Sequence, residues 1–91
     1  MRFSIISEIP GRTRLQLAGP VPESDLDALL KLSGEIDGVR KVRVYGRIGQ
    51  MALEYDESRR DAVLAAVGAL DAQAIADAKT GYVMQLEPRK H

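Results

Sequence analysis

The chain has 91 residues, which is enough for one domain with a single two-layer core and too few for two. Its thirteen Lys and Arg side chains balance thirteen Asp and Glu side chains, so no global field favours nucleic acid or an anionic membrane. The absence of cysteine excludes disulfides, thiolate catalysis and sulfur-ligated metal sites. No apolar run approaches the roughly 20 residues that span a bilayer, and Ser7 and Glu8 interrupt the apolar N-terminal stretch. We expect a cytoplasmic domain that does not insert into a membrane.

Two strand-like segments begin the chain, residues 3–8 and residues 12–18. Pro10 and Gly11 lie between them and favour a turn, so the two segments form either a hairpin or one long strand bent at this point. Alternate side chains of a strand point to opposite faces. In the second segment we therefore expect one set inside and the other outside, namely Thr13, Leu15 and Leu17 against Arg12, Arg14 and Gln16.

A first helix is expected to begin after Pro22. Ser24 is the predicted N-cap, and Asp27 completes an approximate capping box. The acidic residues Glu23, Asp25 and Asp27 complement the positive end of the helix. The apolar face of this helix is expected at helical spacing: Leu26, Leu29, Leu30 and Ile36. Gly38 follows as the expected left-handed residue that ends the helix.

A hairpin is predicted after this helix. Residues 39–44 and 51–55 alternate apolar with polar side chains, and the turn at residues 46–49 is long enough only for a hairpin. A second helix should then begin near Asp56 or Ser58. Its expected inner face consists of Val63, Ala66, Val67 and Leu70.

The C-terminal part is open to two interpretations. The alanine-rich residues 71–79 either continue the second helix to about residue 78 or restart it after Leu70. Thr80 and Gly81 are expected to end the helix in both cases. Residues 82–87 then alternate like a last strand before a proline.

The predicted order is βαββαβ, with residues 3–8 as an extra strand in front. Two such units with right-handed crossovers form an α+β ferredoxin-like sandwich, whose antiparallel sheet has the order 4-1-3-2 and carries both helices on one face. We expect one domain over residues 1–91, with its core at about residues 9–87. Strand one is central in this order, so residues 3–8 should find no place beside it. Their apolar surface should drive a weak homodimer, and their removal should leave a folded monomer.

Three segments resemble a known family. They are residues 9–15 (IPGRTRL), 36–44 (IDGVRKVRV) and 49–56 (GQMALEYD). In this order they resemble the heavy-metal-associated domains that precede or accompany heavy-metal-translocating P-type ATPases, and the PGR-x-R-L motif looks like a divergent subgroup at ATPase N-termini. The similarity covers roughly residues 9–70. It implies a ferredoxin-like scaffold and a role in heavy-metal transport.

The family's metal-binding signature, C-x-x-C between strand one and helix one, has no counterpart here. The corresponding loop, residues 19–25, reads GPVPESD. Copper(I) needs soft sulfur ligands, so copper chaperoning does not carry over. Glu23, Asp25 and Asp27 could offer oxygen ligands to a hard ion such as magnesium, calcium or manganese, but the loop has fewer ligands than a rigid cage needs. We expect neither a metal site nor a cofactor, and His91 is not read as a ligand.

Four basic residues are expected on the sheet face that no helix covers: Arg12, Arg14, Lys41 and Arg43. Glu54 and Glu87 are expected to pair with Arg12 or Arg14 across strands. RNA-binding relatives of this fold stack bases on outward aromatic side chains, which the central strands lack here because Tyr55 faces inward and Tyr45 lies at a strand end. The sequence therefore disfavours nucleic-acid binding without excluding it as an alternative.

The chain is not expected to be an enzyme. It has no cysteine, no internal histidine and no phosphate-binding glycine loop, and it lacks the asparagine that acylphosphatases of this fold use with an arginine. The leading hypothesis is a regulatory or protein-docking domain for a metal-transporting P-type ATPase or related partner. The alternatives are a self-associating structural module that uses the N-terminal strand and a weak single-stranded nucleic-acid binder.

Overall fold

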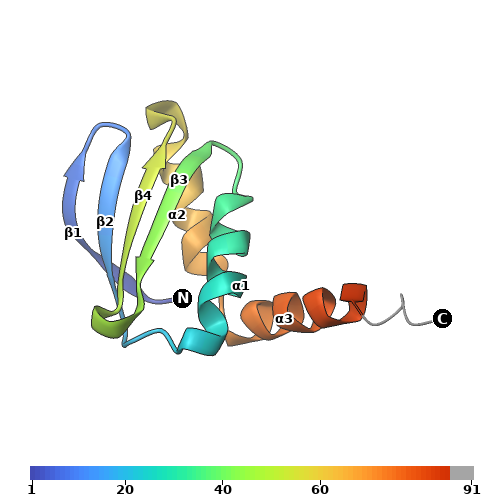
Figure 1. Cartoon of the computed structure of the whole chain (residues 1–91). Coiled ribbons are helices and arrows are strands. Elements are labelled where there is room, and N and C mark those ends of the chain that lie inside the picture. The colour runs from blue at the N-terminus through green and yellow to red at the C-terminus, as the bar shows by residue number, and fades with distance from the viewer. Residues whose placement is uncertain (87–91) are drawn as a thin grey trace.

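The computed structural model describes residues 1–86 of the chain and the side chains of residues 1–79. It is an α+β structure with one four-stranded antiparallel sheet (Figure 1). The elements, in chain order, are β1 (Phe3–Ile9), β2 (Arg12–Leu17), α1 (Glu23–Gly34), β3 (Val39–Tyr45), η1 (Gly46–Ile48), β4 (Gln50–Tyr55), η2 (Glu57–Arg59), α2 (Arg60–Ala69) and α3 (Ala72–Leu86). None of the helices in this part of the chain is long and apolar enough to cross a membrane.

The molecule has two layers (Figure 1). The strands lie in the order β1-β2-β4-β3, and α1 and α2 pack on the same face of the sheet. The third helix, α3, begins beside α1 and extends away from the sheet. No helix of residues 1–86 covers the opposite sheet face (Figure 1).

The predicted strand order 4-1-3-2 is wrong, because the expected last strand is absent from the described residues. Helix α3 continues through Thr80 and Gly81 and ends at Leu86, so residues 82–86 are helical, and Glu87 lies outside the described residues. The alanine-rich start of α3 has high helix propensity, and a helix already formed adds further residues at little cost. The edge of β2 where that strand would pair is filled by β1 instead.

Of the two interpretations of the N-terminal segment, the hairpin is confirmed. Strand β1 pairs with β2 along its length, from Phe3 opposite Leu17 to Ile9 opposite Arg12, with an irregularity at Ile6. Gly11 has a φ of 77° in the turn, a conformation that favours glycine. The expectation that residues 3–8 find no place beside β2 is therefore wrong, which removes the argument for a homodimer that rested on it.

The core lies between the sheet and the two helices. The predicted inward set of β2 is confirmed, and Leu29, Leu53 and Val67 are completely buried. Leu30 is an exception, since it is 38% exposed rather than on the inner face of α1. The buried residues that form the apolar core cluster come from four elements: Leu15, Leu17, Leu29, Met51, Leu53, Tyr55, Val63 and Val67.

The helix boundaries partly follow the predictions. Pro22 occupies the N-cap position of α1 and no side chain caps the helix, so the predicted Ser24 cap is wrong. The chain turns helical again at Asp56, whose carboxylate accepts a hydrogen bond from the Ser58 amide (3.1 Å). Helix α2 stops at Ala69 and α3 restarts at Ala72, as the second of the two C-terminal interpretations predicts.

Candidate docking surface

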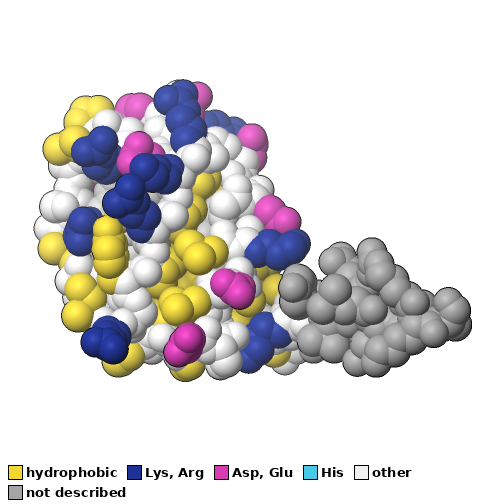
Figure 2. Space-filling model, viewed as in Figure 1, with side chains coloured by type: hydrophobic (Ala, Val, Ile, Leu, Met, Phe, Trp, Pro, Cys, Tyr) yellow, Lys and Arg dark blue, Asp and Glu magenta, His cyan; other side chains and the backbone are white. Residues whose placement is uncertain are grey.

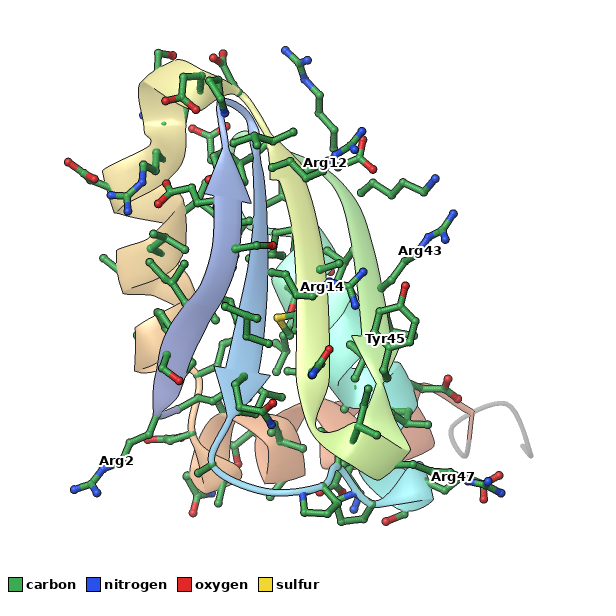
Figure 3. All side chains as sticks on the ribbon, turned by 90° about the vertical axis from the view of Figure 1, so that its left-hand side faces the viewer. Arg2, Arg12, Arg14, Arg43, Tyr45 and Arg47 are labelled. Atoms are coloured by element: carbon green, nitrogen blue, oxygen red, sulfur yellow. The ribbon has the colours of Figure 1, made fainter. Side chains whose placement is uncertain are left out.

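The uncovered sheet face carries a group of basic side chains. Figure 3 looks at this face, with α1 and α3 behind the sheet, α2 beside β1, and Arg12, Arg14 and Arg43 projecting from the strands. The strand register places Lys41 on the same face, because it alternates with the inward Val42 and lies opposite Glu54. Basic side chains also gather over the upper part of the sheet in the space-filling view (Figure 2). We call Arg12, Arg14, Lys41 and Arg43 the basic face.

Strand β4 lies between the two strands that carry these residues, so its outward side chains determine what each basic residue meets. Glu54 lies between Arg12 and Lys41, and Ala52 lies between Arg14 and Arg43. None of the four forms an ion pair with a carboxylate among residues 1–79, so the predicted pairing with Glu54 does not occur there. The other expected partner, Glu87, lies outside the described residues.

Arg14 differs from the other three because its guanidinium is held in place. Its Nη1 donates to the Gln50 side-chain oxygen at 3.3 Å, and its Cζ lies 5.1 Å from the centre of the Tyr45 ring. A cation over an aromatic face is attracted by the electron-rich ring. Arg14 is half-buried, whereas Arg12 and Arg43 are exposed.

A chain of hydrogen bonds supports this arginine. The Gln50 amide donates to the Gln16 side-chain oxygen at 3.3 Å, and the Gln16 amide donates to the carbonyls of Ile48 and Gly49 at 3.0 Å each. The backbone of the β3–β4 turn thus positions two glutamines, which position Arg14. Sequence alternation placed Gln16 beside Arg14, but it did not reveal Gln50 or Tyr45 as partners, because the register between strands brings them together.

The groups with shifted pKa values lie elsewhere. The hydrogen bonds that Arg60 donates to Glu8 lower the pKa of that carboxyl below 4.5 and raise the pKa of the guanidinium. The Ser58 hydroxyl and amide likewise lower the pKa of Asp56. The first contact ties β1 to α2 and the second caps a helical turn, so both have structural explanations.

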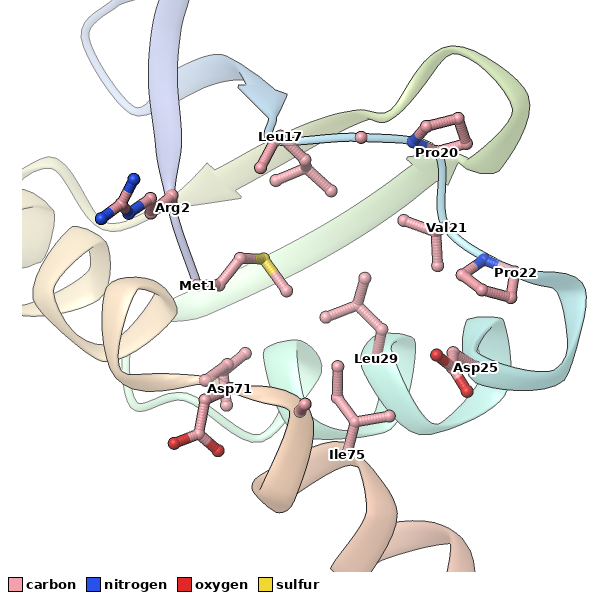
Figure 4. Close-up of a pocket in the computed structure, with 14 residues that line it drawn as sticks. Met1, Arg2, Leu17, Pro20, Val21, Pro22, Asp25, Leu29, Asp71 and Ile75 are labelled. Atoms are coloured by element: carbon pink, nitrogen blue, oxygen red, sulfur yellow. The ribbon is translucent and has the colours of Figure 1, made fainter.

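The three acidic residues proposed as oxygen ligands, Glu23, Asp25 and Asp27, do not come together in the described part of the chain. Asp25 pairs with Lys79 of α3 at 2.9 Å, while Glu23 and Asp27 are exposed. No three His, Asp or Glu side chains in that part come together as metal ligands would. The loop borders a mainly apolar pocket of about 290 Å³, whose walls include Leu17, Val21, Leu29 and Ile75 (Figure 4). The pocket was not predicted, because it forms where the loop, α1 and the α2–α3 junction meet.

Comparison with family models, with curated proteins and with solved structures found no match to this chain.

Proposed function

We propose that this chain is a non-catalytic docking domain of the heavy-metal-associated type, without a thiolate metal site, that binds a metal-transporting P-type ATPase or a related protein in the cytoplasm. The three segments that resemble that family each contain one of the glycines with positive φ, namely Gly11, Gly38 and Gly49. The resemblance thus coincides with the turns that shape the scaffold. In this proposal the scaffold is a ferredoxin-like sandwich whose edge strand comes from the N-terminus.

The observation that carries the proposal is the basic face. It presents four cations on β2 and β3, the two strands that flank β4, without an ion-paired carboxylate among residues 1–79. They lie on the sheet face that no helix of the described residues covers (Figure 3). Charges across protein interfaces are arranged to be complementary, so the fitting partner surface is acidic. A scaffold of this kind needs no metal to bind a protein.

The test is an NMR titration of the labelled chain with the purified cytosolic domains of a heavy-metal-translocating P-type ATPase from the same organism. We expect shifted amide signals on β2, β4 and β3, and binding weakened at least about tenfold by the double variant Arg14→Glu, Arg43→Glu. Matched controls are Arg2→Glu and Arg47→Glu, at exposed positions away from the upper sheet (Figure 3). An absence of shifts at high partner concentration would contradict the proposal.

The outer edge of β1 supports self-association as a second candidate function. This edge is unpaired among the described residues, and Ile5, Ile6 and Ile9 are 43%, 48% and 56% exposed. Long apolar edge strands tend to pair with another chain. Light scattering at near-millimolar concentration should then give a dimer mass that Ile6→Lys abolishes. A monomer mass for the unmodified chain would refute this candidate.

A further inference from the structure

Two side-chain contacts restrict the conformations of Arg14 before any partner binds. Its guanidinium contacts the Gln50 amide oxygen and the face of the Tyr45 ring. A long side chain normally becomes ordered when it binds, and this ordering opposes association. Because these contacts restrict Arg14, we expect it to bind an anion with a smaller entropic cost than Arg12, Lys41 or Arg43.

Most N–H donors of the Arg14 guanidinium form no hydrogen bond among residues 1–79. A guanidinium carries five N–H donors in a rigid fork, and Arg14 donates one hydrogen bond, to Gln50, among residues 1–79. A fixed fork with free donors is suited to bidentate recognition of a carboxylate.

The neighbouring residues favour an anion at this point of the face. Ala52, which lies between Arg14 and Arg43, has a short side chain that leaves room above the strand. The next β4 residue on the same face is Glu54, which lies between Arg12 and Lys41 and would repel a second anion. Positive charge is therefore least compensated over Ala52.

The same arrangement disfavours a nucleic acid. The Tyr45 ring face that a base would use is covered by Arg14, and Glu54 interrupts the track that a row of phosphates would follow. A single carboxylate from a protein meets neither obstacle.

We propose that Arg14 and Arg43, with Ala52 as the floor between them, form a carboxylate clamp that receives an Asp or Glu side chain from an acidic peptide segment of the partner. This inference rests on the proposed docking function and specifies which residues bind the partner. Arg14 supplies the fixed bidentate fork, and Arg43 supplies a second, mobile cation. Gln50, Gln16 and Tyr45 are positioning residues that act through Arg14.

A carboxylate supplied by the chain itself tests the clamp. The substitution Ala52→Glu places a carboxylate between the two arginines, and Ala52→Gln is the neutral control of matched size. With a fluorescent oligoglutamate peptide as the probe, we expect Ala52→Glu to weaken binding at least about tenfold and Ala52→Gln to weaken it less than about threefold. Without any probe, Ala52→Glu should melt at a higher temperature than Ala52→Gln. Equal behaviour of the two variants would refute the clamp.

A pair of conservative variants tests the fork if Ala52→Glu fails to fold. Arg14→Lys keeps the charge but removes the fork and its stacking on Tyr45, whereas Arg12→Lys changes an arginine without these contacts. The first should weaken oligoglutamate binding at least about fivefold and the second by less than about twofold. Equal losses, or tighter binding of a single-stranded oligonucleotide than of oligoglutamate, would overturn the proposal.

The clamp and the proposed ATPase partner can fail separately. Oligoglutamate binding with the expected pattern of variants, together with no binding to the ATPase domains, would support the clamp and refute that partner. Binding to the ATPase domains that Ala52→Glu and Arg14→Lys leave unchanged would refute the clamp and keep the docking function.

Discussion

Deleting residues 2–8 distinguishes the observed sheet from the predicted one. With a C-terminal strand beside β2, the shortened chain would stay folded, whereas in the structure β1 covers that edge through six register pairs, of which the deletion removes all but Ile9–Arg12. Cross-strand pairs contribute about 0.2–1 kcal/mol each, so the lost pairs cost roughly 1–5 kcal/mol. Typical stabilities of about 0.05–0.15 kcal/mol per residue give a chain of this size roughly 5–14 kcal/mol. We expect the deletion to abolish cooperative unfolding or to lower its urea midpoint strongly.

Circular dichroism during urea denaturation measures this effect, and two point variants check its direction. Phe3 is half-buried against the core, whereas Ser4 is exposed and points to the other face. Phe3→Ala should cost about 1–3 kcal/mol, less than a fully buried phenylalanine, and Ser4→Ala should change stability by less than about 0.5 kcal/mol. A deletion variant that unfolds cooperatively at the wild-type midpoint would refute the reasoning.

Four further predictions concern the core, a buried hydroxyl, pH and metals. Leu53→Ala should lower the free energy of unfolding by about 2–5 kcal/mol in denaturant melts, and Arg43→Ala by well under about 1 kcal/mol, because the first side chain is fully buried and the second exposed. Equal losses would show that the inner and outer faces of the sheet are assigned wrongly. Ser33→Ala should stabilise the chain by about 1 kcal/mol, since the buried Ser33 hydroxyl has no hydrogen-bond partner among the described residues; a loss of stability would indicate a partner. The pKa of Glu8 is lowered by Arg60, so this contact stabilises the fold fully above about pH 4.5 and less as the pH falls through the lowered pKa. The melting temperature of Glu8→Gln should therefore fall less on acidification than that of the wild type. If both proteins show the same dependence of melting temperature on pH, the Glu8–Arg60 contact does not cause the acid destabilisation. Titration calorimetry with copper(I) or zinc(II) should detect no site tighter than about micromolar, or roughly 8 kcal/mol, and one tight site would contradict the absence of a metal centre.

The parts of the fold that depend on neighbours a few residues away could be predicted. Alternation along residues 12–17 and 51–55 identified which side chains face the core, and the turn at Pro10 and Gly11 follows from the conformations that these two residues favour. Alternation was also enough to predict that the four basic residues lie on one sheet face. It was not enough to show that Arg14 is held in place, because the contact with Tyr45 depends on how β3 aligns with β4.

The occupant of the edge beside β2 was decided by tertiary structure. Two segments far apart in sequence have strand-like patterns, residues 3–8 and residues 82–87, and each could pair with β2. The first segment reaches β2 through a two-residue turn. The second is separated from β2 by a much longer stretch of chain, and the entropic cost of closing a loop rises by about 0.6 kcal/mol for each doubling of its length. The second follows an alanine-rich helix that extends through it as far as Leu86. The sequence by itself determined which faces residues 12–17 and 51–55 bury. The conformation of residues 82–86 and the occupant of the edge beside β2 were decided by tertiary structure, because they depend on which segment pairs with β2 at the lower free energy.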